Sequence, residues 1–371
     1  MGLKMSEETI YIDSGTLENF MRDVFEGLGV PKDDASIIAE VLITSDLRGI
    51  DSHGIQRCKM YYDRIKAGIY EVITKIDIIK EGPTTALLDG NCGMGHVIAY
   101  KAMKMAIDKA KQYGLGAVAV RNSTHFGIAG FYSLMAIDEG MIGLAVTNAR
   151  PSIPPTFGVE PMLGTNPLTI GAPTDEDFPF LLDAATSIIQ RGKVEVYERT
   201  NKPLPKNTVI NEKGEFITDA GRVLKKMGEK KAALLPLGGK GEDTAGYKGY
   251  GYATVVELLS SALQKGIYLR DTIGIVENGQ KRLKVGHFFL VINIESFNGL
   301  DSFKKTAGSI MKDLRESSKE PGSKKIYTAG EKEYLTEEER KKTGIPLNKS
   351  LQIDIKIMQA ELGLDEYNFS F

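Results

Sequence analysis

The sequence predicts an α/β fold that begins with a helical unit. Before about residue 70, apolar side chains recur at the three- and four-residue spacing of helices, without a strand pattern. From Thr85 onward, short apolar runs alternate with segments of helical spacing, which is typical of α/β proteins. The longest apolar run, Phe288–Ile292, has the length of a buried strand and is far shorter than the ~20 residues of a membrane-spanning helix.

The composition is that of a globular protein with one large or two to three ordinary domains. The chain has 371 residues, of which 42% are hydrophobic and 26% are charged. With 47 basic and 49 acidic side chains, the formal net charge is -2. This balance gives no electrostatic reason to expect nucleic acid or an acidic membrane as a partner, although it is compatible with a local basic site for a small anion.

The N-terminus and the cysteines bear on the compartment. Met1–Ser14 carries charged residues and no apolar core, so we expect no secretory signal peptide and a cytoplasmic protein. The two cysteines, Cys58 and Cys92, are too few for a disulfide framework and do not form a metal-binding cluster with histidines. We therefore expect two reduced thiols and no metal.

Three helices are expected in the N-terminal unit. The first covers about Leu17–Leu28, where apolar residues share one face. Pro31 suits the start of the second helix, which runs to about Arg48. Ser52 is a favourable N-cap for a third helix that ends near Gly68.

The remainder of the chain predicts strands that alternate with helices. Strands are expected at Thr85–Asp89, Ala117–Val120, Ile142–Thr147, Leu168–Gly171, Phe180–Asp183 and His287–Ile294. Helices are expected at Val97–Tyr113, Ala129–Asp138, Phe303–Glu316 and Leu351–Leu362, and after the glycine-rich loop Gly238–Gly251 as far as about Leu263. The polar stretch 198–231 predicts a surface excursion, and the long loop rich in proline after Thr147 is of the kind that carries function.

The third helix carries a polar stripe. If His53 is its first helical residue, Arg57 and Tyr61 follow at intervals of four and share its face. A histidine, a guanidinium and a phenol arranged in this way can hold a carboxylate, which the guanidinium binds through two parallel hydrogen bonds. The alternative interpretation is an ordinary solvated helix face.

A second histidine, His125, lies in the loop that follows the strand at Ala117–Val120. Loops at strand ends are frequent positions for catalytic groups, because the sheet supports them rigidly. Imidazole is the usual group for proton transfer in catalysis, because its pKa lies near neutral pH. The alternative is a loop histidine that only bonds to backbone. His96 and His287 are expected to be structural.

Neither glycine-rich loop fits a standard nucleotide-binding motif. After Gly93 and Gly95, the dinucleotide fingerprint requires a small residue where this chain has Ile98, and no acidic residue follows at the expected distance. In the second loop, Gly246 is followed by Tyr247 rather than by the Lys-Ser/Thr of a P-loop. Neither loop therefore indicates a dinucleotide fingerprint or a P-loop.

Five motifs in order give the chain a resemblance to a known family. They are Asp46–Arg57 (DLRGIDSHGIQR), Asn122–Gly130 (NSTHFGIAG), Gly164–Pro167 (GTNP), Leu182–Thr186 (LDAAT) and Lys248–Gly251 (KGYG). With these motifs the chain resembles the malate/L-lactate dehydrogenase family, which also includes sulfolactate and ureidoglycolate dehydrogenases. The resemblance extends from about Thr16 to Leu364. It implies an α/β fold with a mixed sheet and no Rossmann domain, a homodimer, and NAD or NADP as cofactor.

The resemblance also implies a domain arrangement. Residues 1–82 would be a helical unit that packs with the C-terminal helices of 300–371. Residues 83–150 would be an α/β catalytic part. Residues 151–299 would bind the cofactor and include the excursion at 198–231.

The resemblance further implies roles for individual residues. His125 would exchange the proton with the substrate oxygen. His53, Arg57 and Tyr61 would hold the substrate carboxylate, and Asn166 would line the same site. The cofactor would contact Asp183, Ala184, Ala185, Lys248, Gly330 and Glu331. At Gly330 and Glu331 the match is weaker, because Ala329 stands where many relatives have proline.

Malate is the expected substrate, followed by L-lactate and sulfolactate. Malate has a second carboxylate that needs a second cation, for which Arg48, Arg150 and Arg191 are candidates. One alternative is NAD(P)H-dependent reduction of a cyclic imine such as a pyrroline or piperideine carboxylate, which needs the same carboxylate anchor. An alternative of another class is a nucleotide-binding protein without catalysis.

Overall fold

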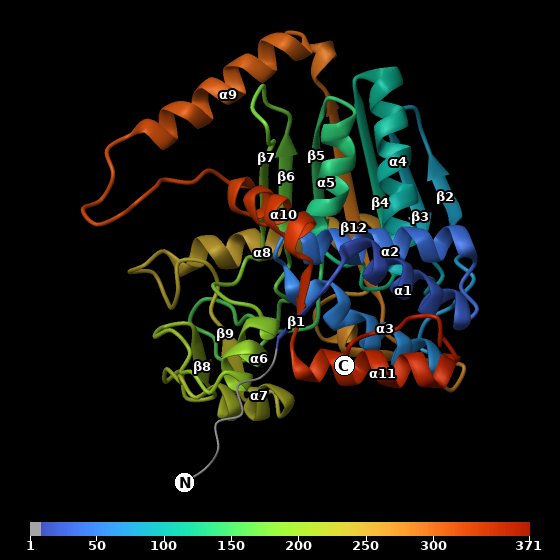
Figure 1. Cartoon of the computed structure of the whole chain (residues 1–371). Helices are drawn as coiled ribbons and strands as arrows, with labels where there is room; N and C mark the ends of the chain where they lie inside the picture. The colour runs from blue at the N-terminus through green and yellow to red at the C-terminus, as the bar shows by residue number, and fades with distance from the viewer. Residues whose placement is uncertain (1–8) are drawn as a thin grey trace.

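The fold is built around a mixed sheet of seven strands, seen in a computed structural model that describes residues 9–371 (Figure 1). The strand order is β2-β3-β4-β12-β5-β6-β7. The strands are β2 (Asp77–Glu81), β3 (Thr85–Asp89), β4 (Leu115–Ser123), β5 (Met141–Thr147), β6 (Leu168–Ala172), β7 (Phe180–Ala184) and β12 (Val285–Asn293). The six predicted strands are all present, whereas the edge strand β2 was not predicted. Residues 1–8 lie outside the described residues, and they belong to the segment Met1–Ser14 in which we expect no signal peptide.

The pairing of the strands confirms the prediction of a fold other than the Rossmann fold. Within this sheet only β3 and β4 are parallel, and every other neighbouring pair is antiparallel. Strand β12 contains the longest apolar run and lies between β4 and β5, so both of its backbone edges are hydrogen-bonded to neighbouring strands. A run of this kind belongs in the middle of a sheet because its unpaired edges would otherwise be exposed.

Helices α4 (Gly95–Tyr113) and α5 (Ala129–Asp138) pack along the sheet (Figure 1). Their apolar faces form one core cluster with β3, β4 and β12. Helix α4 approaches β4 so closely at Gly116 that a Cβ there would lie 1.9 Å from the carbonyl oxygen of Ala106. Glycine is therefore required at this contact, because any side chain would push the helix off the strand.

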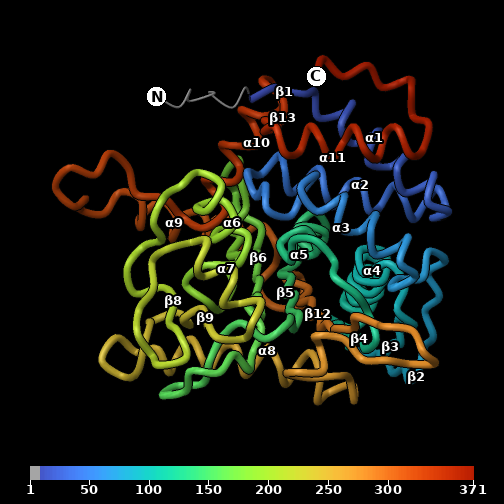
Figure 2. Tube along the Cα trace, turned by 90° about the horizontal axis from the view of Figure 1, so that it is seen from below, coloured from blue at the N-terminus to red at the C-terminus, as the bar shows by residue number. Residues whose placement is uncertain are grey.

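The N-terminal helices and the last helix share a second core. It joins α1 (Ser14–Gly27), α2 (Lys32–Leu47), α3 (Ile55–Lys66) and α11 (Lys349–Leu362), which run side by side (Figure 2). Strand β1 (Ile10–Ile12) pairs with β13 (Ile345–Leu347) and ties the two ends of the chain together. The other long C-terminal helix, α9 (Leu300–Glu316), lies apart from this core and is bound to the β6–β7 hairpin through Arg315 and Glu176.

The predicted start of the third helix is wrong. Ser52 and His53 belong to a short 3₁₀ turn, Asp51–His53, and α3 begins only after Gly54. The N-cap is supplied from a distance: Asp46 Oδ2 accepts the Ile55 amide at 2.7 Å. A Cβ at Gly54 would lie only 2.0 Å from Asp46 Oδ1, so the backbone must pass the carboxylate as glycine.

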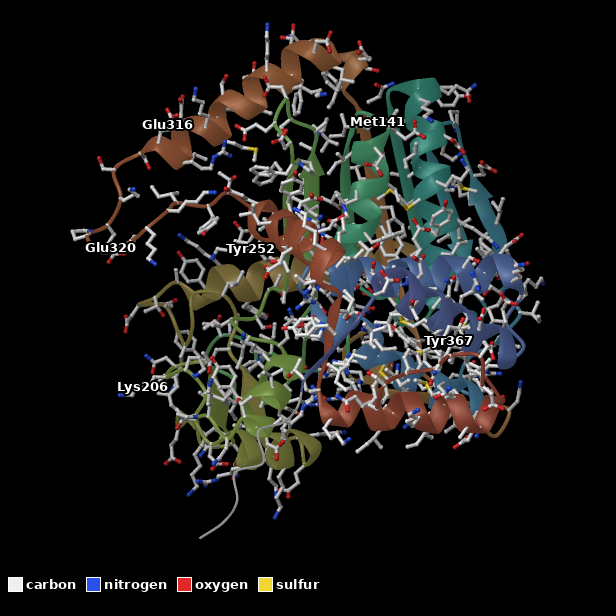
Figure 3. The ribbon with its side chains drawn as sticks, in the orientation of Figure 1. Met141, Lys206, Tyr252, Glu316, Glu320 and Tyr367 are labelled. Carbon is white, nitrogen blue, oxygen red and sulfur yellow. The ribbon has the colours of Figure 1, made fainter. Side chains whose placement is uncertain are left out.

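The segment that we expected to be a polar excursion has a core of its own. Helices α6 (Arg191–Arg199) and α7 (Ala220–Gly228) pack with the hairpin of β8 (Val209–Asn211) and β9 (Ala232–Leu234). Val194, Val209 and Val223 are fully buried among them. Polar residues such as Lys206, labelled in Figure 3, occupy the outside of this unit.

Several further elements differ from the prediction or escaped it. Helix α8 (Gly246–Ser260) starts inside the expected glycine loop, and α10 (Glu331–Thr343) and the hairpin of β10 (Ile275–Glu277) and β11 (Gln280–Arg282) were not predicted. After Glu316, the last residue of α9, the chain projects as an arm that carries Glu320 (Figure 3). Cys58 and Cys92 are free and buried. Within residues 9–371, no helix has the length and apolar character needed to cross a membrane.

Candidate active site

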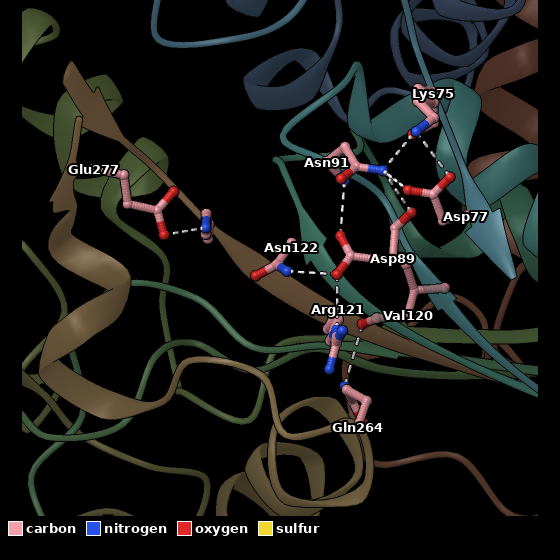
Figure 4. A network of polar contacts seen from close by, with 10 residues as sticks. Lys75, Asp77, Asp89, Asn91, Val120, Arg121, Asn122, Gln264 and Glu277 are labelled. Atoms are coloured by element: carbon pink, nitrogen blue, oxygen red, sulfur yellow. Dashed lines mark hydrogen bonds and ion pairs between the residues drawn. The ribbon is translucent and has the colours of Figure 1, made fainter. Parts of the chain in front are cut away.

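A polar network fixes the end of strand β4, from which the His125 loop departs (Figure 4). Asp89, at the end of the parallel neighbour β3, accepts hydrogen bonds from Arg121 Nε and Asn122 Nδ2, both at 2.8 Å. Asn91 donates its amide to the other oxygen of Asp89 at 3.0 Å. Strand β4 extends to Ser123, so the loop is shorter than predicted and its first residues are strand.

The loop itself is held against the start of α4. The amide of Gly95 donates to Thr124 Oγ1 at 2.9 Å, and this hydroxyl donates to the carbonyl of Gly93 at 2.9 Å. A Cβ on Gly95 would lie 2.5 Å from the carbonyl oxygen of His125. The glycine-rich turn that failed the dinucleotide fingerprint therefore serves to hold the histidine loop, because only glycine permits this approach.

His125 lies against Tyr61 and His53. Its Nδ1 is 2.5 Å from Tyr61 Oη and 3.4 Å from the Gly127 amide nitrogen. The ring of His53 is stacked on the ring of His125 with 5.7 Å between centroids, and His53 Nδ1 is 2.9 Å from Ser52 Oγ. The structure thus brings His53, Tyr61 and His125 together, although His53 reaches the site from a 3₁₀ turn rather than from the helix stripe.

The surroundings of both histidines favour the neutral imidazole. Desolvation lowers the pKa of His125 well below its ordinary value, and His53, Arg57 and Arg64 lower it further. Desolvation, followed by the charge of Arg57, lowers the pKa of His53 to about 4. A negatively charged molecule at this site would oppose these effects and favour protonation of His125.

Two arginines without carboxylate partners, Arg57 and Arg64, act on His125, and both also act on a third, Arg150. Among residues 9–371, Arg57, Arg64 and Arg150 have no carboxylate within ion-pair distance. Arg57 donates Nε to the carbonyl of Ser52 at 2.6 Å, which leaves its two Nη groups free. Desolvation lowers the pKa of Arg150, and Arg64, Arg191 and Arg57 lower it further. Such a group of cations favours the binding of an anion.

Asn166 supports this site without offering a free amide. Its side chain is completely buried: Oδ1 accepts the Ala149 amide at 3.1 Å, while Nδ2 donates to Glu257 Oε2 at 2.8 Å and to the carbonyl of Ala253 at 2.9 Å. Since Ala149 precedes Arg150, these bonds fix the backbone from which Arg150 extends.

Glu257 is the centre of that support and was not found from the sequence. Its Oε1 accepts Asn148 Nδ2 at 3.2 Å and the Leu269 amide at 3.0 Å, in addition to the bond that Asn166 makes to Oε2. The available signal was an acidic residue within the apolar run Val255–Leu259 of a predicted helix. Arg64 was also missed, although it lies seven residues after Arg57 and three after Tyr61 on the same helix face.

Arg48 and Arg191, the other two candidates for the second carboxylate, are paired with carboxylates of the protein, unlike Arg150. Arg48 is buried and forms an ion pair with Glu337 of α10 at 3.0 Å, and its other terminal nitrogen has no partner. It is not among the charges that act on His125. Arg191, at the start of α6, is paired with Glu195 at 3.1 Å but its charge still acts on Arg150.

The candidate cofactor residues fall into two groups. At the β7 edge of the sheet, Asp183 Oδ2 accepts the Gly130 amide at 2.8 Å, and the Leu181 amide donates at 3.2 Å to the carbonyl of Ala329, next to Gly330. Ala184 ends this strand and Ala185 follows it. Glu331 is buried in an ion pair with Lys325 at 2.5 Å. Lys248 forms the other group: it is exposed in the first turn of α8 and has no carboxylate partner among the described residues.

The remaining histidines and cavities lie outside this arrangement. His287 is bonded to Thr147 Oγ1 at 2.8 Å and to Ser123 Oγ at 2.7 Å, and burial lowers its pKa to about 3. His96 is buried in the first turn of α4, with its ring 4.7 Å from that of Tyr61. In the described part of the chain, no three His, Cys, Asp or Glu residues are grouped as metal ligands require. An open depression of about 750 Å³, lined by Lys101 and Asp108, lies away from His125.

A family model described as malate/L-lactate dehydrogenase matches residues 12–356. The chain belongs to this family. It is 44% identical over 360 residues to the malate dehydrogenase of Pyrococcus abyssi, and the aligned residues cover 97% of each protein. It is 37% identical over 345 residues to the L-sulfolactate dehydrogenase of Methanocaldococcus jannaschii, and the aligned residues cover 92% of this chain and 94% of the relative. The crystal structure of malate dehydrogenase from Entamoeba histolytica is 44% identical, with a TM-score of 0.94 over 98% of this chain and 100% of that one.

Membership of the family confirms several predictions. The protein is an enzyme, a 2-hydroxy acid dehydrogenase with the mixed α/β fold of the family, and dehydrogenases of this family use a nicotinamide cofactor. The alternative of a nucleotide-binding protein without catalysis is therefore wrong.

Proposed function

We propose that the protein interconverts malate and oxaloacetate with a nicotinamide cofactor. The observation that carries this proposal is the position of His125, which contacts Tyr61 and is surrounded by arginines without carboxylate partners. A proton-transferring imidazole beside several free guanidinium groups suits a substrate with one reacting oxygen and two carboxylates. Malate dehydrogenases among the relatives support the same substrate.

His125 would exchange a proton with the substrate oxygen through Nε2. In the tautomer that carries its hydrogen on Nδ1, this atom donates to Tyr61 Oη instead of accepting the Gly127 amide, and Nε2 keeps its lone pair and can act as the base in oxidation. In reduction, the protonated ring donates from the same atom. Tyr61 is buried and burial raises its pKa, so its hydroxyl remains neutral and can orient the imidazole.

The carboxylates would be held by guanidinium groups. Arg57 would bind the C1 carboxylate through its two Nη groups, since its Nε is occupied by Ser52. His53 would complete this contact from its stacked position over His125. Arg150, held by Asn166 and Ala149, would reach the second carboxylate.

The residues present fit a nicotinamide nucleotide. Lys248 stands unpaired in the first turn of α8, where the positive end of the helix favours phosphate groups. Arg48 keeps one buried terminal nitrogen without a partner near the β7 edge, where Asp183, Ala184, Ala185, Gly330 and Glu331 lie. When bound, the nicotinamide ring accepts or supplies the hydride. We propose these residues as its binding site, with NAD and NADP as the two forms to compare.

A substrate panel tests the proposal. The purified protein is mixed with NADH or NADPH and, in turn, with oxaloacetate, sulfopyruvate, pyruvate and a pyrroline carboxylate, while the absorbance of the reduced nicotinamide is followed. We expect the highest kcat/KM with oxaloacetate. Turnover of the cyclic imine alone would replace the proposal by imine reduction, and the faster coenzyme identifies the preferred cofactor.

The two directions of the reaction should differ in their dependence on pH. In the free enzyme the pKa of His125 lies below about 6.5, so its protonated fraction falls tenfold for each pH unit above neutrality. We expect kcat/KM for oxaloacetate reduction to decline with that slope between about pH 7 and 9. Malate oxidation needs the neutral ring, so its kcat/KM should stay level over the same range. Initial rates in both directions give the two profiles, and an oxidation rate that climbs through pH 8 would contradict the assignment.

The homodimer that the resemblance implies also belongs to this proposal. Helix α8 exposes Tyr252, Val255 and Leu258 to solvent, and Tyr252 projects from the surface (Figure 3). A row of exposed apolar side chains on one helix is typical of surfaces that bind a protein partner. We propose a second copy of the chain as that partner. Light scattering on the purified protein measures the mass and would overturn this if it gave a single chain.

A further inference from the structure

We infer that Arg64 determines the specificity of this site: together with Arg150, its guanidinium holds a second anionic group, a carboxylate or a sulfonate, on C3 of the substrate. This inference deepens the proposed function and rests on it. It assigns to Arg64 the choice between keto acids with one anionic group and those with two.

The first argument is the position of Arg64 on α3. At about 100° per residue, positions 57, 61 and 64 lie within ~60° of one another around the helix axis. Tyr61 Oη contacts His125 Nδ1 at 2.5 Å, so this face of α3 is turned toward the reacting oxygen. Arg57 lies one turn before that contact and Arg64 one turn after it. A substrate held at C1 by Arg57 and at its oxygen by His125 would extend its C3 toward Arg64.

The second argument is the absence of a counter-charge for Arg64. Its Nη1 donates to Tyr70 Oη at 2.5 Å, and its guanidinium carbon lies 5.5 Å from the centre of that ring. The first acidic residue after Arg64 in the sequence, Glu71, is already paired with Arg282 at 2.5 Å. Within residues 9–371, Arg64 therefore has a neutral acceptor but no carboxylate within ion-pair distance.

The third argument is the proximity of Arg64 to Arg150. After desolvation, Arg64 is the strongest influence that lowers the pKa of Arg150, and it also lowers the pKa of His125. Mutual repulsion between these cations is unfavourable in the unliganded protein. An anion between Arg64 and Arg150 would remove that repulsion, whereas a neutral methyl group at the same place would not.

The alternative is that Arg64 only supports the fold. By stacking on Tyr70 it could hold this ring against Tyr61, since the two tyrosine rings lie 6.5 Å apart. A support of this kind would affect all substrates equally, because it would act through the placement of Tyr61 and His125. A binding role affects only substrates with a second anion, so the two can be separated by measurement.

The experiment compares four keto acids in Arg64→Gln, Arg64→Lys and the wild type. Oxaloacetate and sulfopyruvate carry a second anionic group, whereas pyruvate and 2-oxobutyrate do not. We expect Arg64→Gln to lower kcat/KM by about 30-fold or more for the first two. For the other two we expect less than about a threefold change. Arg64→Lys should recover part of the loss because it keeps the charge but not the planar fork.

The controls separate the possible failures. Arg222→Gln removes an exposed arginine from α7 and should leave all four values unchanged. If pyruvate and 2-oxobutyrate turn over too slowly to time, their competitive inhibition of oxaloacetate reduction gives the same comparison. Equal losses for all four acids, or none, would overturn the inference and leave the proposed function intact. If the wild type reduces none of them, the proposed function fails and the inference fails with it.

Discussion

Replacement of His125 by asparagine should lower kcat by about 10²- to 10⁴-fold in both directions of the reaction, because asparagine cannot exchange a proton. The imidazole is in contact with Tyr61 Oη, and no other described histidine is both bonded in this way and flanked by Arg57 and Arg64. Asparagine is smaller and can still accept a hydrogen bond, so the loop should keep its conformation. Steady-state rates with oxaloacetate and malate measure the loss.

Two companion measurements make this result specific to proton transfer. Tyr61→Phe removes the hydroxyl that selects the tautomer but keeps the imidazole, so we expect a smaller loss of about tenfold. Binding of the reduced nicotinamide, followed by its fluorescence, should be the same in His125→Asn as in the wild type. A His125→Asn enzyme with kcat within about tenfold of the wild type would show that another group moves the proton.

Much of the fold could be predicted because its strands and long helices have strong local patterns. The apolar run at Phe288–Ile292 indicated a buried strand, and the apolar spacing together with Pro31 located α1 and α2 to within a few residues. The start of α3 could not be predicted, because its first amide, that of Ile55, is bonded to Asp46, which lies nine residues away in sequence. Short elements such as β1 and β2 were missed because they form through hydrogen bonds to their partner strands and have no strong pattern of their own.

The site was predicted in part, for a related reason. His125 was recognised in its motif and Tyr61 by its helical spacing after Arg57, and the structure brings them into contact. Asn166 was expected to contact the substrate, but both ends of its side-chain amide are hydrogen-bonded within the protein. Its partners are Ala149 and Glu257, and Glu257 is far away in sequence. Arg64 had a readable signal in its helical spacing. Its lack of a counter-charge becomes visible only in three dimensions, because Glu71 is taken by Arg282.

Replacement of Arg57 by glutamine should lower kcat/KM for every keto acid, whether or not it carries a second anion. Loss of one member of a hydrogen-bonded charge pair commonly costs about 2–5 kcal/mol, which corresponds to about 30- to 4,000-fold in kcat/KM. The C1 carboxylate is common to all 2-keto acids, so pyruvate and oxaloacetate should lose alike. Initial rates with both acids, at substrate concentrations well below KM, give the two ratios.

Comparison of the Arg57 and Arg64 variants shows which of the two arginines binds the C1 carboxylate. The two arginines lie on one face of α3, on opposite sides of Tyr61, and neither has a carboxylate partner among residues 9–371. Arg57 differs in that Ser52 holds its Nε at 2.6 Å and the backbone of Gly192 packs beside its Nη2, so its fork is fixed in advance. Arg57→Lys should therefore recover little, since lysine keeps the charge but cannot bind a carboxylate through two parallel bonds. If Arg57→Gln weakened oxaloacetate alone and spared pyruvate, Arg57 would bind the second anion and the orientation proposed for the substrate would have to be reversed.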